Sequence, residues 1–90
     1  MLIIYRKRKF KLTFNPENKE LRSKVAEVLS DYTCSCEKEY FDLGVVPFGP
    51  NRVPAARYSC SINDELFDDF VKDLEKRIEN VGIVGLHIEN

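Results

Sequence analysis

Three cysteines are the residues whose chemistry and spacing first suggest a site. Cys34 and Cys36 are separated by one residue, and Cys60 lies further along the chain. Thiolates bind metals and form disulfides, so a metal site, a disulfide and a redox switch are the alternatives. The C-x-C spacing is not that of a zinc site, and an odd number of cysteines argues against a closed disulfide framework. Because free cysteine is usually buried as a small apolar residue, we expect three reduced core thiols without a metal.

His87 is the only histidine of the chain, and therefore the only side chain whose ordinary pKa lies near neutral pH. Alternation along residues 83–88 places it opposite Val84 and Leu86, towards water. Nothing in the sequence places a nucleophile or a carboxylate beside it, and no G-x-S-x-G, phosphate-binding glycine loop or H-E-x-x-H motif occurs. We therefore predict no catalytic residue, no cofactor and no enzymatic activity.

Charge is unevenly distributed along a chain whose net charge is only −1. Residues 1–24 hold eight Lys and Arg against two Glu, a net charge of +6, whereas residues 25–90 have a net charge of −7. Alternation places four basic residues on one open sheet face: Lys7, Lys9, Lys11 and Arg57. A basic sheet face can bind nucleic acid, but the aromatic residues that would stack on bases are missing here. A solvated basic face is favoured over a nucleic-acid site.

An acidic surface is predicted on the helix that begins after residue 63. Its members are Asp64, Glu65, Asp68 and Asp69. Such a surface is either an ordinary solvated helix face or a contact surface for a basic partner. In the second case the chain could act as a small inhibitor that imitates nucleic acid.

The first elements that would position these residues are a strand and a helix. In residues 9–14, Phe10, Leu12 and Phe14 share one strand face. Asn15 followed by Pro16 predicts a helix start, with Asn15 as the N-cap. The helix is marked by an apolar stripe, namely Leu21, Val25, Val28, Leu29 and Tyr32.

Two further strands, over residues 32–41 and 56–62, are predicted to form a hairpin centred near Phe48. That centre places Cys36 opposite Cys60. Asn63 (or Ser61) caps a second helix, which ends at Asn80 and Gly82, before a last strand over residues 83–88. The apolar stripe of this helix is Leu66, Phe67, Phe70, Val71, Leu74 and Ile78.

The order strand, helix, strand, strand, helix, strand resembles the ferredoxin-like β-α-β-β-α-β fold. It predicts an α+β, single-domain, two-layer sandwich over residues 1–90, in which two helices cover one face of an antiparallel sheet. Folds of this kind host many unrelated functions.

The N-terminal residues conflict with one regular strand. Continued alternation would place Arg6 and Arg8 on the buried face with Phe10, and unpaired buried charges are costly. We therefore expect either a bulge near residues 6–9 or a separate segment over residues 2–5. The apolar run 2–5 would then pack locally at the sheet or pair with a second chain.

Residues 42–54 are predicted to form a long loop because they contain Gly44, Pro47, Gly49, Pro50 and Pro54. This segment is unusually apolar for a surface loop, so it either contacts a partner or packs back over the end of the sheet. Val46, Phe48 and Arg52 are the predicted partner-binding residues.

These observations favour a small non-catalytic binding module that makes protein–protein contacts through the 42–54 loop and a sheet edge. A protein partner or a homodimer is expected, and nucleic acid and membrane are disfavoured. No apolar run is long enough for a signal peptide core or a membrane span, so a cytoplasmic location is expected.

Overall fold

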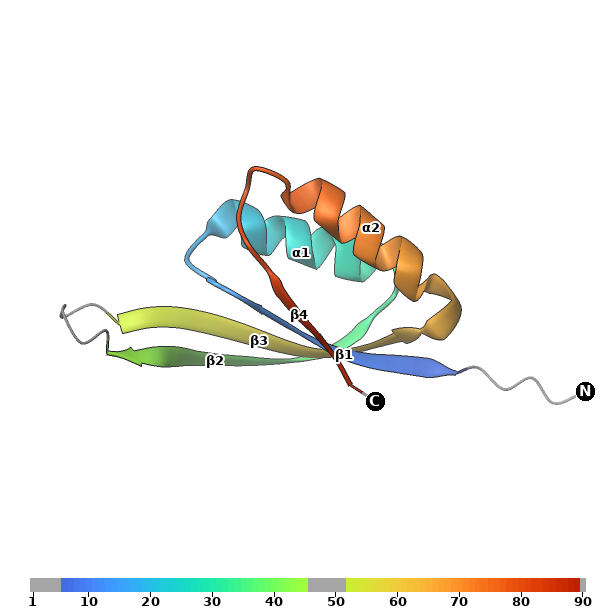
Figure 1. The fold of residues 1–90 in the computed structure, drawn as a ribbon, viewed down its shortest axis with the longest axis horizontal. Coiled ribbons are helices and arrows are strands. Elements are labelled where there is room, and N and C mark those ends of the chain that lie inside the picture. The colour runs from blue at the N-terminus through green and yellow to red at the C-terminus, as the bar shows by residue number, and fades with distance from the viewer. Residues whose placement is uncertain (1–5, 46–51, 90) are drawn as a thin grey trace, which may run out of the picture.

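The computed structural model describes residues 6–45 and 52–89, with residues 43–45 and 52 described by their backbone. The elements are β1 (Lys7–Phe14), α1 (Lys19–Asp31), β2 (Ser35–Val45), β3 (Arg52–Asn63), a 3₁₀ turn (Asp64–Leu66), α2 (Phe67–Ile78) and β4 (Gly85–Ile88). The strands form one antiparallel sheet in the order β2-β3-β1-β4. Both helices cover the same face of this sheet (Figure 1). The predicted ferredoxin-like sandwich is confirmed.

The core lies between the sheet and the two helices. Phe10, Leu12 and Phe14 of β1 are buried, as their alternation predicts. The ring of Phe10 packs 5.0 Å from that of Phe70 in α2, measured between ring centroids. Helical spacing supplies the opposing layer: Leu21, Val25, Val28 and Leu29 from α1, and Phe67, Phe70 and Leu74 from α2. Burying each large side chain stabilises the fold by about 1.5–3 kcal/mol.

Helix α1 begins three residues later than the sequence indicated. Asn18 is the N-cap, and its side-chain oxygen accepts a hydrogen bond from the Leu21 amide at 3.0 Å. Asn15, the predicted cap, instead accepts from the Glu17 amide at 2.9 Å in the preceding turn. Both asparagines are followed by suitable first-turn residues. The prediction of Asn15 was wrong because the earlier Asn closes a local turn that orients the later one.

Helix α2 is preceded by a short 3₁₀ turn. The Asn63 side chain accepts a hydrogen bond from the Glu65 amide, as expected of a capping residue, but the α-helical hydrogen bonding begins only at Phe67. This turn rotates Leu66 out of the predicted apolar stripe, and the residue remains 38% exposed. After the helix, Asn80 adopts a left-handed conformation with φ of 62°.

Of the two alternatives for the N-terminal residues, the bulge near residues 6–9 is wrong within β1. Pairing with β3 runs without a register shift from Lys7 to Phe14. Arg8 therefore lies on the helix side, as regular alternation requires, but at the end of the layer, where its side chain remains 40% exposed. Its Nε is 2.7 Å from a carboxylate oxygen of Asp64, and its guanidinium carbon lies 5.1 Å from the centre of the Phe67 ring. Residues 2–5 lie outside the described residues.

Both ends of the predicted 42–54 loop are strand, and residues 46–51 lie outside the described residues. β2 continues to Val45 and β3 begins at Arg52, with a register irregularity between Asp42 and Val45. Pro54 is tolerated within β3 because the pairing of β1 with β3 stops at Phe14 and Ala56, so that β3 is itself a sheet edge beyond this point. The predicted register is confirmed: Cys36 lies opposite Cys60.

No helix in the described ranges is both long enough and apolar enough to cross a membrane.

Candidate functional site

The β2–β3 hairpin extends past the helix layer. Beyond the last β1 pair, Phe14 with Ala56, the two strands continue to pair with each other as far as Val45 and Arg52. Figure 1 shows this two-stranded arm reaching beyond both helices. The far part of the arm therefore lies outside the helix layer.

Two exposed apolar side chains lie at the base of this arm and within it: Tyr40, opposite Ala56, and Val53. Tyr40 is 58% exposed and Val53 38% exposed. Tyr40 borders a hollow of about 490 Å³ between the arm and the start of α1. The hollow is lined by Pro16, Glu17, Lys19, Arg22, Tyr40 and Pro54. It combines an aromatic ring and two prolines with charged groups, and so could take an apolar side chain together with a polar or charged group beside it.

Tyr40 is held in place by its neighbour Tyr58. The two hydroxyl oxygens lie 3.4 Å apart and share a hydrogen bond, and the rings meet edge to face with centroids 6.5 Å apart. Tyr58 is buried, and burial together with the Tyr40 hydroxyl raises the pKa of Tyr58. Tyr58 therefore stays neutral near neutral pH, and the shared hydrogen bond makes the exposed ring of Tyr40 a pre-oriented contact surface.

The predicted partner-binding residues adjoin this surface in the sequence. Val46 and Phe48 lie outside the described residues, and only the backbone of Arg52, which starts β3, is described. The sequence interpretation did not single out Tyr40. Its signal was the continuation of the β2 alternation, in which Cys36, Lys38 and Tyr40 share one face.

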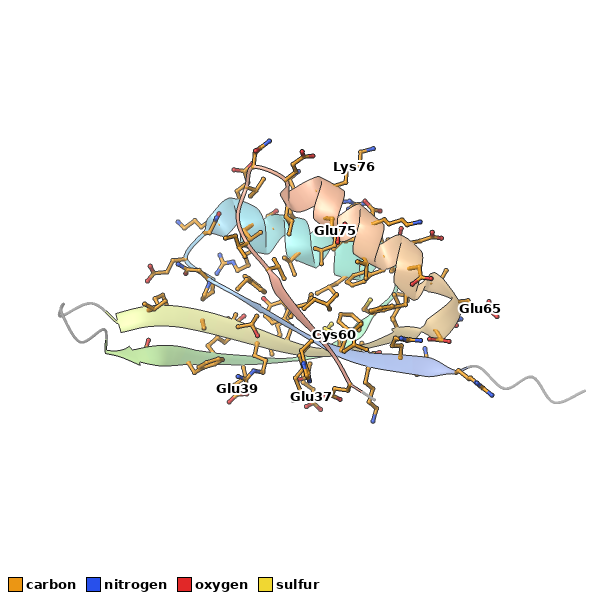
Figure 2. The ribbon with its side chains drawn as sticks, viewed as in Figure 1. Glu37, Glu39, Cys60, Glu65, Glu75 and Lys76 are labelled. Carbon is orange, nitrogen blue, oxygen red and sulfur yellow. The ribbon has the colours of Figure 1, made fainter. Side chains whose placement is uncertain are left out.

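The open sheet face carries charges of both signs. Lys7, Lys9, Lys11 and Arg57 share this face, as predicted. The pairing of β2 with β3 adds Glu37 beside Ser59 and Glu39 beside Arg57. Figure 2 shows both glutamates pointing away from the helices. The face is therefore mixed rather than basic.

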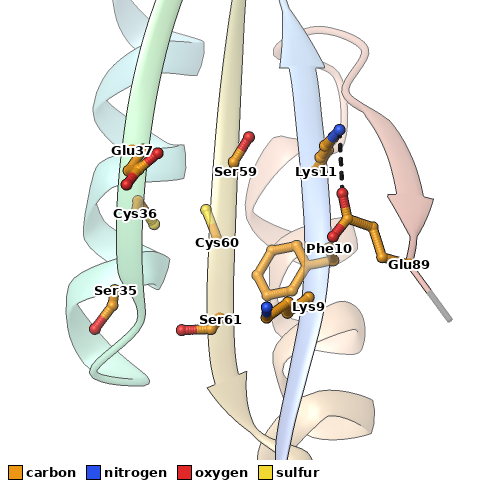
Figure 3. Close-up of a pocket in the computed structure, with 10 residues that line it drawn as sticks. All are labelled: Lys9, Phe10, Lys11, Ser35, Cys36, Glu37, Ser59, Cys60, Ser61 and Glu89. Atoms are coloured by element: carbon orange, nitrogen blue, oxygen red, sulfur yellow. Dashed lines mark ion pairs between the residues drawn. The ribbon is translucent and has the colours of Figure 1, made fainter.

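A shallow hollow of about 400 Å³ occupies the middle of that face. Figure 3 shows Ser35, Glu37, Ser59 and Ser61 around it, with Lys11 paired to Glu89. The Nζ atom of Lys11 is 3.1 Å from the Glu89 carboxylate. His87 lies opposite Lys11 in the register of β1 and β4, so the lone histidine is on the open face as expected.

The first residue of the predicted acidic surface, Asp64, is neutralised by an ion pair. Asp64 is already paired with Arg8, which leaves Glu65, Asp68 and Asp69 as its exposed members. Tyr32, the C-cap of α1, also donates a hydrogen bond to the backbone carbonyl of Asp69 at 3.3 Å.

A second apolar surface lies along the sheet edge at β4. Leu86 and Ile88 are partly exposed and line a hollow of about 380 Å³ with Phe67 and Val71 of α2. β4 pairs only with β1, so its other edge is free of any strand in the described part of the chain.

The three cysteines gather on the helix side of β2 and β3. Cys60 is buried, whereas Cys34 and Cys36 are half-buried against the core. Across residues 6–45 and 52–89, no group of three or more His, Cys, Asp and Glu side chains has an arrangement suited to a metal ion.

Comparison with known proteins defines the class of fold. No protein-family model matches this sequence, and no curated protein sequence does. Among solved structures, an unknown protein from Galdieria sulphuraria aligns over 100% of this chain with a TM-score of 0.66 and 18% identity. The alignment covers 54% of that protein, so this chain spans about half its length. At this identity the likeness shows a shared fold.

Two further structures align over 93% of this chain. One is the regulatory subunit of aspartate kinase from Thermus flavus, with a TM-score of 0.47, 16% identity and 52% of its chain covered. The other is the GlnK–ATP complex of B. subtilis, with a TM-score of 0.43, 11% identity and 83% of its chain covered.

Proposed function

We propose that this chain is a small non-catalytic binding module that acts through protein–protein contacts of the β2–β3 hairpin and a sheet edge. The observation that carries the proposal is the exposure of Tyr40 beside the hollow at the start of α1, at the base of the β2–β3 arm. Tyr and Arg are the residue types enriched in binding hot spots, and the hollow offers both, as Tyr40 and Arg22.

Pre-orientation makes Tyr40 an effective anchor. Its hydroxyl is already hydrogen-bonded to Tyr58, so little side-chain freedom would be lost on binding. Burying a large apolar side chain contributes about 1.5–3 kcal/mol, roughly a tenfold to hundredfold change in affinity. We propose that Val46, Phe48 and Arg52 extend the same contact surface.

The sheet-edge part of the proposal falls on β4. An exposed strand edge flanked by the apolar Leu86 and Ile88 can pair with a strand of another chain. A second copy of this chain is the simplest such partner, which would make a homodimer.

The two alternative functions have less support. Glu37, Glu39 and Glu89 offset the basic residues of the open face and weaken attraction to phosphate groups. The pairing of Asp64 with Arg8 likewise reduces the acidic surface that an inhibitor would use as a nucleic-acid mimic.

A photo-crosslinking amino acid placed at position 40, and separately at position 48, tests the hairpin surface in the native cell. Position 76 is the matched control, because Lys76 is exposed and points away from the sheet (Figure 2). We expect discrete crosslinked protein bands from positions 40 and 48 that resist nuclease treatment. Equal bands from all three positions, or bands removed by nuclease, would refute the hairpin surface.

The same surface is tested with Tyr40→Ala once the crosslinked partner is identified. Association should weaken by tenfold or more, while stability changes by no more than about 1 kcal/mol because most of the ring faces solvent. Lys76→Ala serves as the control in both measurements. A large loss of stability with unchanged binding would make Tyr40 structural.

A further inference from the structure

The pair Cys36 and Cys60 has an arrangement that the binding function does not use. The two residues face each other directly across the antiparallel strands β2 and β3. Cys60 is buried, 4% exposed, whereas Cys36 is half-buried on the edge strand and can be reached by a small molecule. We propose that Cys36 is a site of reversible oxidation by peroxide, and that Cys60 converts the oxidised Cys36 into an intramolecular β2–β3 disulfide.

The strand register brings the two cysteines within reach of a disulfide. Residues directly opposite each other in antiparallel strands have Cα atoms about 4.5–5.5 Å apart. A disulfide needs a Cα separation of about 4.4–6.8 Å, so the register brings the pair within range. Figure 3 shows the Cys36 and Cys60 side chains pointing towards each other between the two strands, and a hydrogen bond between the thiols is among the causes of their pKa shifts.

The surroundings favour Cys36 as the sulfur that reacts first. The hydrogen bond from Cys60 and the nearby ammonium of Lys38 lower the pKa of Cys36 against the opposing effect of burial. The same hydrogen bond and burial raise the pKa of Cys60. Burial also raises the pKa of Cys34, to about 12. Because the thiolate is the reactive form, Cys36 is the nucleophile of the three.

The oxidation balances as two steps. The Cys36 thiolate attacks one oxygen of hydrogen peroxide, so that an S–O bond forms, the O–O bond breaks, and the departing hydroxide takes the proton lost by Cys36 to become water. Cys60 then gives up its proton and attacks the Cys36 sulfur. The S–S bond forms, the S–O bond breaks, and a second water leaves. The two sulfurs together lose two electrons, which reduce the peroxide.

Cys34 is excluded as the partner of Cys36 by its position. It precedes β2 by one residue and lies two residues from Cys36 along the chain. At about 3.3 Å per residue of extended chain, their Cα atoms are roughly 6.6 Å apart, at the upper limit for a disulfide. Peroxide also fits the half-buried site better than a bulkier oxidant such as a glutathione disulfide.

The test is to treat the reduced chain and its Cys34→Ser variant with stepwise hydrogen peroxide, and then to alkylate the free thiols. We expect the mass to fall by two hydrogen atoms and the free thiols of the native chain to fall from three to one. Cleavage at Lys24, Lys38 and Arg57 should yield a linked pair of peptides that contain residues 25–38 and Cys60. In Cys34→Ser the linked residue can only be Cys36. Dithiothreitol should restore all thiols.

A Cys60→Ser variant adds a second readout. Without the resolving thiol, oxidised Cys36 should persist as a sulfenic acid that dimedone labels, and no internal link should form. The proposal is overturned if neither the native chain nor Cys34→Ser forms the internal link. It is also overturned if the link disappears in Cys34→Ser, or if it joins two chains. The peptide map of the native chain and Cys34→Ser decides the question even if Cys60→Ser fails to fold.

Discussion

At the scale of single residues, Arg77 shows how one side chain joins the two helices. Its guanidinium lies 2.7 Å from the carboxylate of Asp31, at the end of α1, and 2.8 Å from that of Asp73 within α2. Tyr32 donates a further hydrogen bond to Asp73 at 3.2 Å. These bonds lower the pKa of Asp73 from its ordinary value of 3.8, with the Arg77 hydrogen bond as the largest cause.

This lowered pKa predicts the sign of a pH effect. Because the folded form holds Asp73 ionised more strongly than the unfolded chain does, its contribution is complete above pH 3.8 and disappears as the pH falls through the lowered value. Asp73→Asn should therefore be less stable than the native chain near neutral pH, and the difference should shrink in acid. Urea denaturation near neutral pH and in acid measures this difference in the free energy of unfolding. Asp68→Asn, at an exposed carboxylate on the same helix, is the control, and a difference for Asp73→Asn that does not change with pH would contradict the assignment.

At the scale of elements, the connection from α2 to β4 packs against the start of α1. The side chain of Asn18, whose oxygen caps α1, also donates a hydrogen bond from its amide nitrogen to the backbone carbonyl of Val81 at 2.9 Å. The next residue, Gly82, packs closely against α1, and an added Cβ there would lie 2.8 Å from a methyl carbon of the buried Leu21. This glycine is needed for close packing.

Gly82→Ala should therefore destabilise the protein by about 1–3 kcal/mol, the usual cost of overpacking a core. Gly85→Ala is the matched control, because its added Cβ would meet nothing closer than 3.6 Å. We expect the control to change stability by about 0.5 kcal/mol or less. Thermal or urea unfolding measures both, and equal effects would show that Gly82 is not tightly packed.

Periodicity was sufficient to predict the elements and much of their pairing. The spacing of the apolar residues of α1 and α2 identified their buried faces, and alternation in β2 and β3 placed Cys36 opposite Cys60. The glycine and proline residues wrongly predicted a loop as far as residue 54. Pro54 lies within β3, at a position where β3 no longer pairs with β1. Alternation in β2 indicates which face Tyr40 occupies, but its exposure could not be predicted, since exposure depends on where the helix layer ends relative to the hairpin.

At the scale of the whole molecule, the charge asymmetry along the sequence does not produce two opposite faces. The sheet order places the basic β1 between β3 and β4, and β2 lies beyond β3. Lys11 thereby meets Glu89, and Arg8 meets Asp64. Local charge is therefore balanced by topology, so long-range attraction to a strongly charged partner is weaker than the sequence alone suggests.

The outer edge of β2 has a consequence for colloidal stability. β2 is a long strand at the border of the sheet, and three consecutive charged residues, Glu37, Lys38 and Glu39, lie along its middle. Charges at such an edge oppose the addition of further strands from other molecules, which is the first event in aggregation. Replacing Glu37 and Glu39 by Gln should therefore leave the fold intact but increase light scattering in concentrated solution. Replacing Glu65 and Glu75 on the helix side by Gln should not increase the scattering. Equal scattering from the two variants would show that the effect comes from net charge alone.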